Sequence, residues 1–247
     1  MATPRLNDSR IGSALADDVG ARASGSTLAS PHAAHGVALF VTLERELTLT
    51  SRHATVRGRV VMAPADTVYA LASPGPTLGI CFDPERMPRV AGAARAAGRP
   101  VALDGRVAQH LVAALHAHRG ELTDTSVLVG LAREAAAVIA GSPVPLDRRV
   151  AHVVEALRDP DACVPRVPIS SAHLSELFAR DVGVPIRTYR LWRRLLRALL
   201  AYARTDATTA AHAAGFADLA HFSRTCRRML GYSPTILRDG VSPGSDS

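Results

Sequence analysis

The chain has 247 residues, of which 47% are hydrophobic, and this length and apolar content suit two small domains with buried cores. Its formal net charge is +7, and all 29 basic residues are arginine. From Leu146 onward 15 arginines stand against 10 acidic residues, whereas the preceding part has 14 against 12. The basic excess therefore lies in the C-terminal part, as contact with nucleic-acid phosphates requires.

The cysteines and the hydropathy pattern argue against a secreted or membrane protein. Cys81, Cys163 and Cys226 are far apart and form no CxxC pair, which favours reduced cysteines that bind no metal. No run approaches the ~18 apolar residues of a membrane span, and the N-terminus lacks the apolar core of a signal peptide. We expect a cytoplasmic protein with no membrane partner.

Residues 1–30 consist mostly of Ala, Gly, Ser, Asp and Arg and show little periodicity. We expect a flexible arm over this range.

Residues 32–85 follow a strand pattern. Gly36–Leu43 is a short apolar run, and further on Leu47 and Leu49 alternate with threonines. Proline and glycine supply turns at regular intervals. Several short strands with regular turns predict a small β-barrel or sandwich.

The mouth of such a barrel could hold an organic effector. The candidate lining residues are His35, Leu39, Val61, Tyr69 and Leu71. His32 and His35 are three apart and would point to opposite faces of a strand, so we expect no metal site and no cofactor.

Residues 105–118 and 123–140 have apolar side chains at helical spacing and predict two helices after the barrel. Gly141–Pro145 reads as a short, stiff boundary. We therefore divide the chain into a barrel domain over 31–141, a linker over 142–145, a helical domain over 146–240 and a disordered tail over 241–247.

The helical domain begins with a helix over 146–159. A second helix over 170–185 and a long third helix beginning at Pro185 follow. Between the first two, the stretch DPDACVPRVPI carries three prolines and cannot form a regular helix.

The last segment, Asp206–Pro234, reads as two short helices joined by a tight turn. Gly215 permits the turn, Phe216 fills the angle between the helices, and Asp218 stands where an N-cap belongs. The second helix has one apolar stripe, and its opposite side carries small, polar and arginine side chains.

This segment resembles the second helix-turn-helix of the AraC/XylS family of bacterial transcription regulators. The matching residues are Ala211, Ala214, Gly215, Phe216, Asp218, Phe222, Ser223, Arg224, Arg227, Gly231, Ser233 and Pro234. The stretches HAAHGVALFVTLERELTLTSRH and VVMAPADTVYAL are similar to the cupin-like sensor domain of that family. The resemblance implies an α+β protein, with an N-terminal cupin-like β-barrel, two following helices and a C-terminal all-α double helix-turn-helix domain.

The resemblance also implies which residues meet DNA. On the second unit, base edges would be met by Leu219, Ala220 and Ser223, and the DNA backbone by His221, Arg224 and Arg227. On the first unit the DNA-facing positions are Ala172, Ser175 and Glu176. The family has a helix of about two turns where this chain has the proline-rich stretch, so the first unit should be truncated.

The function that the resemblance implies is sequence-specific DNA binding in transcriptional regulation, with activation by a small-molecule effector as the commoner outcome. The implied partners are double-stranded promoter DNA, an effector, a second copy of the chain and, for an activator, RNA polymerase. The helices after the barrel would either form the dimer interface or merely cover the barrel. Two alternatives stay open, namely a degenerate relative that acts only through protein contacts and, more remotely, a cupin-type metalloenzyme.

Overall fold

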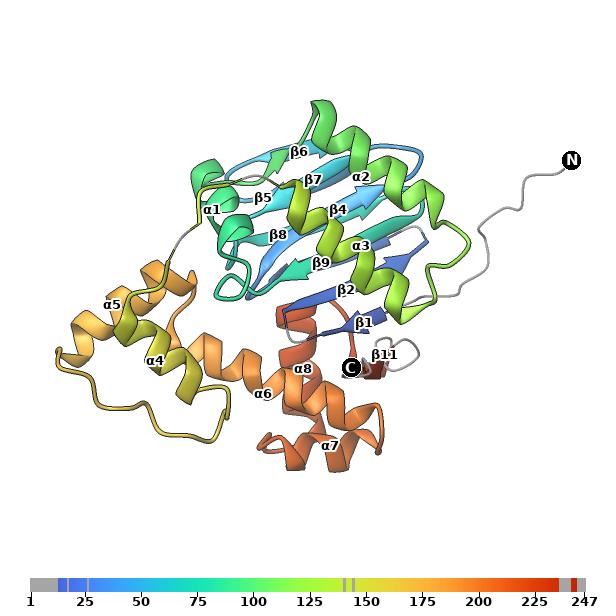
Figure 1. The fold of residues 1–247 in the computed structure, drawn as a ribbon. Coiled ribbons are helices and arrows are strands. Elements are labelled where there is room, and N and C mark those ends of the chain that lie inside the picture. Colours follow the sequence, from blue (N-terminus) through green and yellow to red (C-terminus); the bar gives the residue numbers. More distant parts are fainter. Residues whose placement is uncertain are drawn as a thin grey trace, which may run out of the picture.

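The computed structural model describes residues 13–16, 18–25, 27–139, 141–143, 145–235 and 241–243. Two β-sheets form the N-terminal part, and helices cover one sheet and continue into the C-terminal part (Figure 1). The α+β class and the β-rich region followed by helices agree with the expectation. Within the described residues no helix is both long and apolar enough to cross a membrane.

The larger sheet has seven strands. Their spatial order is β10 (Val101–Ala102), β7 (Val60–Ala63), β4 (Val37–Thr42), β9 (Thr77–Phe82), β2 (Val19–Ser24), β1 (Ser13–Leu15) and β11 (Val241–Pro243). The smaller sheet has the order β3 (Thr27–Ala33), β8 (Val68–Ser73), β5 (Leu47–Ser51) and β6 (Thr55–Gly58). Neighbouring strands are antiparallel except β1 and β11, which are parallel.

Apolar side chains on the two faces of the larger sheet form two separate cores. One core lies between the sheets and includes Ala38, Val61 and Leu71. The other lies on the outer face, where Leu39 packs with residues of α1 (Pro88–Ala97), α2 (Gly105–Ala117) and α3 (Thr125–Val138). Because neighbouring residues of a strand point to opposite faces, Ala38 and Leu39 belong to different cores. The two helices expected after the barrel are confirmed and cover the sheet, whereas α1 was not expected.

The expected arm over residues 1–30 is wrong for its described part, because β1, β2 and the first half of β3 lie there. In β2, Val19, Ala21 and Ala23 are buried and alternate with half-buried residues, so the period of two is present. Small alanines carry it, and alanine is depleted in strands, which hid the pattern. The expected disordered tail is also wrong over residues 241–243, which pair with β1. Residues 1–12 and 244–247 lie outside the described range.

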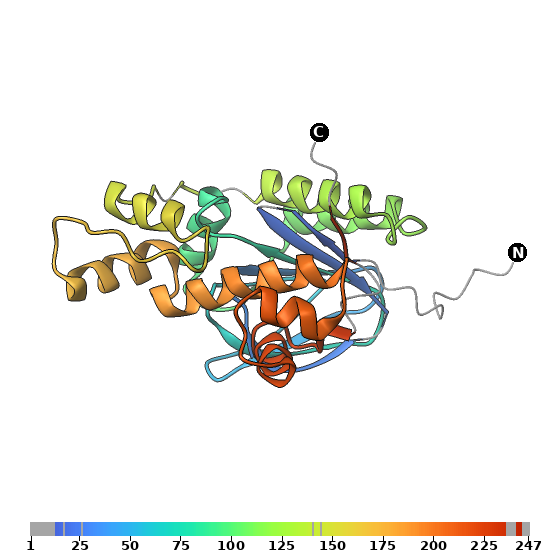
Figure 2. The ribbon, with the colours of Figure 1, turned by 90° about the horizontal axis from the view of Figure 1, so that it is seen from below.

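Five helices form the C-terminal part: α4 (Arg148–Ala156), α5 (Ser171–Val182), α6 (Ile186–Tyr202), α7 (Ala207–Ala213) and α8 (Leu219–Leu230). Figures 1 and 2 show α4 and α5 at one end of α6, and α7 and α8 at the other. The described chain has no helix between Ala156 and Ser171, as the prolines predicted.

Both ends of this helical array touch the barrel. A Cβ added to Gly183, which ends α5, would lie 3.3 Å from the Cβ of Ala65. A Cβ added to Gly231, which ends α8, would lie 2.8 Å from Nδ1 of His32. The C-terminal ends of α5 and α8 therefore abut the barrel.

Candidate nucleic-acid interface and ligand cavity

The helix-turn-helix of α7 and α8 is fixed by caps and one aromatic plug. The Asp218 carboxylate accepts a hydrogen bond from the His221 backbone N–H at 2.6 Å and begins α8. Gly215 has a φ of +78°, which a side chain would make costly, and it turns the chain between the helices. Phe216 is buried, and its ring centroid lies 5.4 Å from that of Phe222. Asp218, Gly215 and Phe216 therefore take the parts expected from the sequence.

One side of α8 is buried against α6. Phe222, Cys226 and Met229 pack in one core with Trp192 and Leu195. The expected apolar stripe is thus present, except that Leu219 is 39% exposed. Thr225 is buried as well, which the sequence pattern did not indicate.

The opposite side of α8 faces solvent. Ala220, Arg224 and Arg227 are exposed, and His221 and Ser223 are half-buried. Within the described chain, neither Arg224 nor Arg227 pairs with a carboxylate. A short helix with a solvated face of small and unpaired arginine side chains can enter a DNA major groove.

The first unit presents a comparable but less basic face. Ser170 caps α5 by accepting from the His173 backbone N–H at 3.2 Å. Ala172, Ser175 and Glu176 are exposed, as expected of DNA-facing positions. However, the Ser175 hydroxyl already donates to the Ser171 carbonyl at 2.8 Å.

A loop takes the place of the helix that would precede α5. The Asp161 carboxylate accepts a hydrogen bond from Arg197 of α6 at 2.6 Å, and this bond lowers the pKa of Asp161. The Pro160 carbonyl accepts from Arg190 at 3.2 Å. Further along, Val167 and Ile169 pack against the core between α4 and α5. The proline-rich stretch is therefore anchored to α6 and supports α5 without forming a helix.

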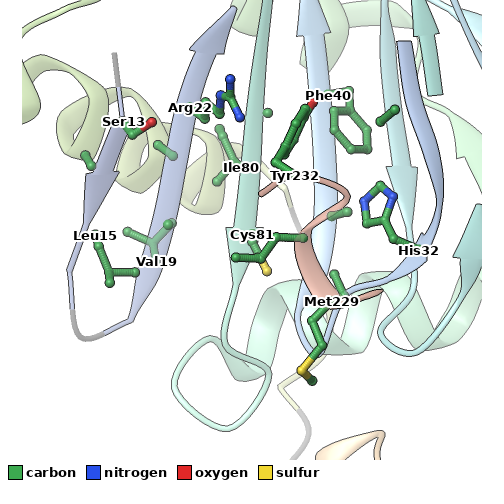
Figure 3. Close-up of a pocket in the computed structure, with 18 of the residues that line it drawn as sticks. Ser13, Leu15, Val19, Arg22, His32, Phe40, Ile80, Cys81, Met229 and Tyr232 are labelled. Atoms are coloured by element: carbon green, nitrogen blue, oxygen red, sulfur yellow. The ribbon is translucent and has the colours of Figure 1, made fainter. Parts of the chain in front are cut away.

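A cavity of about 160 Å³ lies between the barrel and the C-terminal helices (Figure 3). Strands supply Phe40, Tyr69 and Leu71 to its wall, and the helical part supplies Met229 and Tyr232. Burial raises the pKa of the Tyr69 hydroxyl, which therefore stays neutral. The cavity is mostly apolar, and the end of α8 with the segment that follows it forms one of its walls.

Two of the five predicted effector-binding residues, Tyr69 and Leu71, line this cavity. Leu39 does not, because it lies on the helix-covered face of the sheet. Val61 packs between the sheets and does not line the cavity, and His35 lies in a polar cluster. Of the strands that carried predicted residues, β8 lines the cavity with those residues, β4 lines it with its other face, and β7 does not line it.

Arg22 is a charged residue of the cavity that sequence reasoning missed. Its guanidinium lies 4.0 Å from the centroid of the Tyr232 ring (Figure 3). Its Nε and Nη1 atoms are buried and have no hydrogen-bond partner among the described residues. Burial lowers the pKa of Arg22. Once β2 is recognised as a strand, the position of an arginine between two buried alanines is the sequence feature that identifies Arg22.

A second polar group lies at the junction between the barrel and α6. His35, Asp83 and Glu85 are buried and near one another, and the rings of Tyr189 and Trp192 lie over His35. Burial, and then the neighbouring Glu85 carboxylate, raise the pKa of Asp83 to about 7. His32 is not part of this group and packs edge-on against Tyr69, with the ring centroids 4.6 Å apart, so the two histidines do not converge.

Comparison with known proteins gives matches in both parts of the chain. Residues 163–240 match the model of a helix-turn-helix domain family. The arabinose operon regulatory protein of Escherichia coli K12 is 29% identical over 106 residues, which cover 39% of this chain and 36% of that protein. The corresponding protein of Salmonella typhimurium LT2 is also 29% identical over 106 residues, covering 38% of its length. The chain therefore spans little more than a third of these relatives.

The whole fold is similar to that of ToxT from Vibrio cholerae. The TM-score is 0.53 at 9% identity, and the match covers 90% of this chain and 99% of ToxT. A structure of ToxT bound to (E)-4-(8-methylnaphthalen-1-yl)but-3-enoic acid matches with the same TM-score and identity. At this identity the likeness establishes the arrangement of barrel and helices.

Proposed function

The chain belongs to the AraC/XylS family, and from this premise we propose that it is a transcriptional regulator that binds specific DNA sequences mainly through α8. The observation that carries the proposal is the solvated face of α8, with its small side chains and unpaired arginines. Leu219, Ala220 and Ser223 meet base edges, where small and apolar groups favour thymine methyls. Arg224 and Arg227, with His221, hold the DNA backbone.

The way α5 and α8 meet the barrel supports this orientation. Each touches the barrel through the glycine that ends it, Gly183 or Gly231. The N-terminal half of each helix is then free, and recognition helices contact base edges with their N-terminal residues. The first unit contributes less, because Glu176 repels phosphate and the Ser175 hydroxyl is already engaged.

We further propose that the cavity binds an apolar carboxylate as effector. The buried Nε and Nη1 atoms of Arg22 lack acceptors, and a carboxylate accepts a charge-assisted hydrogen bond from such a guanidinium. The apolar walls suit the rest of such a molecule. A ToxT structure contains an aryl butenoic acid, which belongs to this chemical class.

Because the cavity is small, the binding of a ligand is coupled to the binding of DNA. A dry cavity of about 150 Å³ accommodates a benzene-sized molecule, and this one measures about 160 Å³. A larger ligand has to displace Met229 or Tyr232, at the end of α8 and just beyond it. The ligand thereby shifts α8 against the barrel and changes its fit to DNA. Activation, dimer formation and contact with RNA polymerase are the outcomes that we propose for such a regulator.

Selection from a library of random DNA duplexes tests the proposal. The purified chain should enrich one sequence motif, and the Ala220→Asp variant should enrich none, because its carboxylate would face the DNA. Asp in the first turn suits a helix, so this variant should fold normally. The absence of enrichment by the wild-type chain would favour the second candidate, a relative that has lost DNA binding. The loop that replaces a helix before α5 is the observation behind that candidate.

A further inference from the structure

Three side chains with metal-ligating atoms meet at the junction of the barrel and α6, where Asp83 also borders the cavity. His35 lies between β3 and β4, and Asp83 and Glu85 follow β9. One ligand atom from each lies within 4.8 Å of the other two. The side chains of His35 and Glu85 are only 0% and 3% exposed, and Asp83 is 5% exposed.

The close approach of these segments depends on Gly36. A Cβ at this position would lie 2.5 Å from the Cys81 sulfur and 2.5 Å from the Phe82 carbonyl oxygen. Only glycine lets the turn that carries His35 lie on the end of β9. The backbone therefore brings the imidazole to the two carboxylates.

The side chains of His35 and Tyr189 approach the Glu85 carboxylate, and Trp192 approaches Asp83. For His35 and Glu85 none of these contacts has regular hydrogen-bond geometry. Both ring nitrogens of His35 and both carboxylate oxygens of Glu85 are buried without a regular hydrogen-bond partner among the described residues. His35 Nε2 and Glu85 Oε2 lie 3.4 Å apart, longer than the ~2.9 Å of a typical N–H···O bond. Two ligands bound at ~2.1 Å to one tetrahedral ion would be separated by roughly 3.4 Å.

The local charges leave room for a cation. The positive charge of Arg193 of α6 acts on Asp83 and opposes the rise of its pKa. Asp66, which is partly buried, also interacts with His35. Buried charges are stable when they are paired or when they coordinate a metal. With His35 neutral, as a metal ligand is, one arginine balances only one of the two carboxylates.

We propose that His35, Asp83 and Glu85 bind one divalent transition-metal ion, Zn²⁺ or Mn²⁺. One imidazole and two carboxylates suit ions of this class. The ring centroids of Tyr189 and Trp192 lie 5.3 and 5.5 Å from that of His35 and cover the site. The ion is therefore structural, and it fixes the His35 ring, and with it the contact between the barrel and α6.

Trp192 is the only tryptophan of the chain, so its fluorescence reports on the site. The full chain, freed of metal by a chelator, is titrated with Zn²⁺ alone and with Mn²⁺ alone, without DNA, by calorimetry and fluorescence. We expect one equivalent of one of these ions to bind and to change the fluorescence. His35→Ala and Glu85→Gln should weaken binding more than about 100-fold, since even the loss of outer-shell partners costs 10–100-fold.

His118→Ala is the control, because His118 pairs with Glu121 at 2.8 Å on the surface. It should bind the ion as the wild-type chain does. Failure of the wild-type chain to bind either ion saturably would overturn the proposal. Equal affinity of the wild type and Glu85→Gln for the ion would also overturn the proposal. Because glutamine nearly preserves the shape of glutamate, Glu85→Gln provides the test if His35→Ala does not fold. None of these readouts depends on DNA binding.

Discussion

At the scale of single residues, the role of α8 rests on Arg224. This side chain is exposed and unpaired among the described residues, so its charge is available to a phosphate. Replacing it by alanine should weaken binding to the selected duplex and reduce the slope of log K against log salt by about 1. Fluorescence anisotropy over a range of salt concentrations measures both quantities.

Arg106→Ala is the matched control for Arg224→Ala. Arg106 is equally exposed but lies on α2, away from the helix-turn-helix. The Arg106→Ala variant removes the same charge from the chain and should leave the slope of log K against log salt unchanged. An unchanged slope for Arg224→Ala as well would show that this arginine does not contact phosphate.

Gly231 joins the end of α8 to the barrel and should tolerate no side chain. Its φ is +78°, and a Cβ would lie 2.8 Å from His32. Gly231→Ala should lower the free energy of unfolding by more than the ~1–2 kcal/mol that left-handed backbone alone costs. Urea titration measures the loss.

Gly98→Ala separates the cost of the left-handed backbone from the cost of the contact with His32. Gly98 also has a positive φ, +64°, but a Cβ there would have its nearest neighbour 3.9 Å away. Gly98→Ala should show only the cost of the backbone conformation. Equal losses for the two variants would mean that His32 moves aside freely and that the contact with the barrel is soft.

At the scale of elements, α5 is the weaker of the two DNA-reading helices. Glu176 is exposed on its DNA-facing side and repels phosphate. Glu176→Gln should raise affinity for DNA, by up to about fivefold, since exposed charges contribute at most ~1 kcal/mol. Glu46→Gln, which removes an exposed carboxylate far along the barrel, should leave the anisotropy titration unchanged. A fall in affinity for Glu176→Gln would instead indicate a direct contact with a base.

The sequence predicted best those helices in which several local features of the sequence agree. The caps and faces of α5 and α8 were predictable because glycines, capping residues and apolar spacing agree there. On α6, by contrast, Leu195 and Ala198 are buried and Leu200 is 41% exposed, because α7 and α8 pack on a side of α6 that spacing alone does not select. β2 was missed because its buried positions carry mainly alanine.

The candidate site was predictable only in part. The solvated face of α8 follows from one helix and its spacing. The cavity and the His35 cluster combine side chains from β2, β9 and α6, which only the tertiary structure brings together. Asp83 and Glu85 therefore gave no signal in the sequence, and Arg22 gave one only after β2 was recognised as a strand.

At the scale of the whole molecule, the cavity should couple effector binding to DNA binding. A carboxylate such as 4-phenylbutanoate should bind and change the affinity for the selected duplex, because it pairs with Arg22 and displaces the segment after α8. The neutral alcohol 4-phenylbutanol should bind much more weakly. Arg22→Met should abolish the difference between the two compounds in calorimetry. Equal binding of acid and alcohol by the wild-type chain would contradict the role of Arg22.

The most direct test of DNA reading by α8 is the ratio of affinities for the selected duplex and for a scrambled duplex of the same composition. Measured by anisotropy at one fixed salt concentration, the wild-type ratio should lie within the roughly 10³–10⁷ of specific DNA-binding proteins. Ala220→Asp should bring it close to one while the chain stays folded. A wild-type ratio near one, or a high ratio that survives Ala220→Asp, would contradict the account.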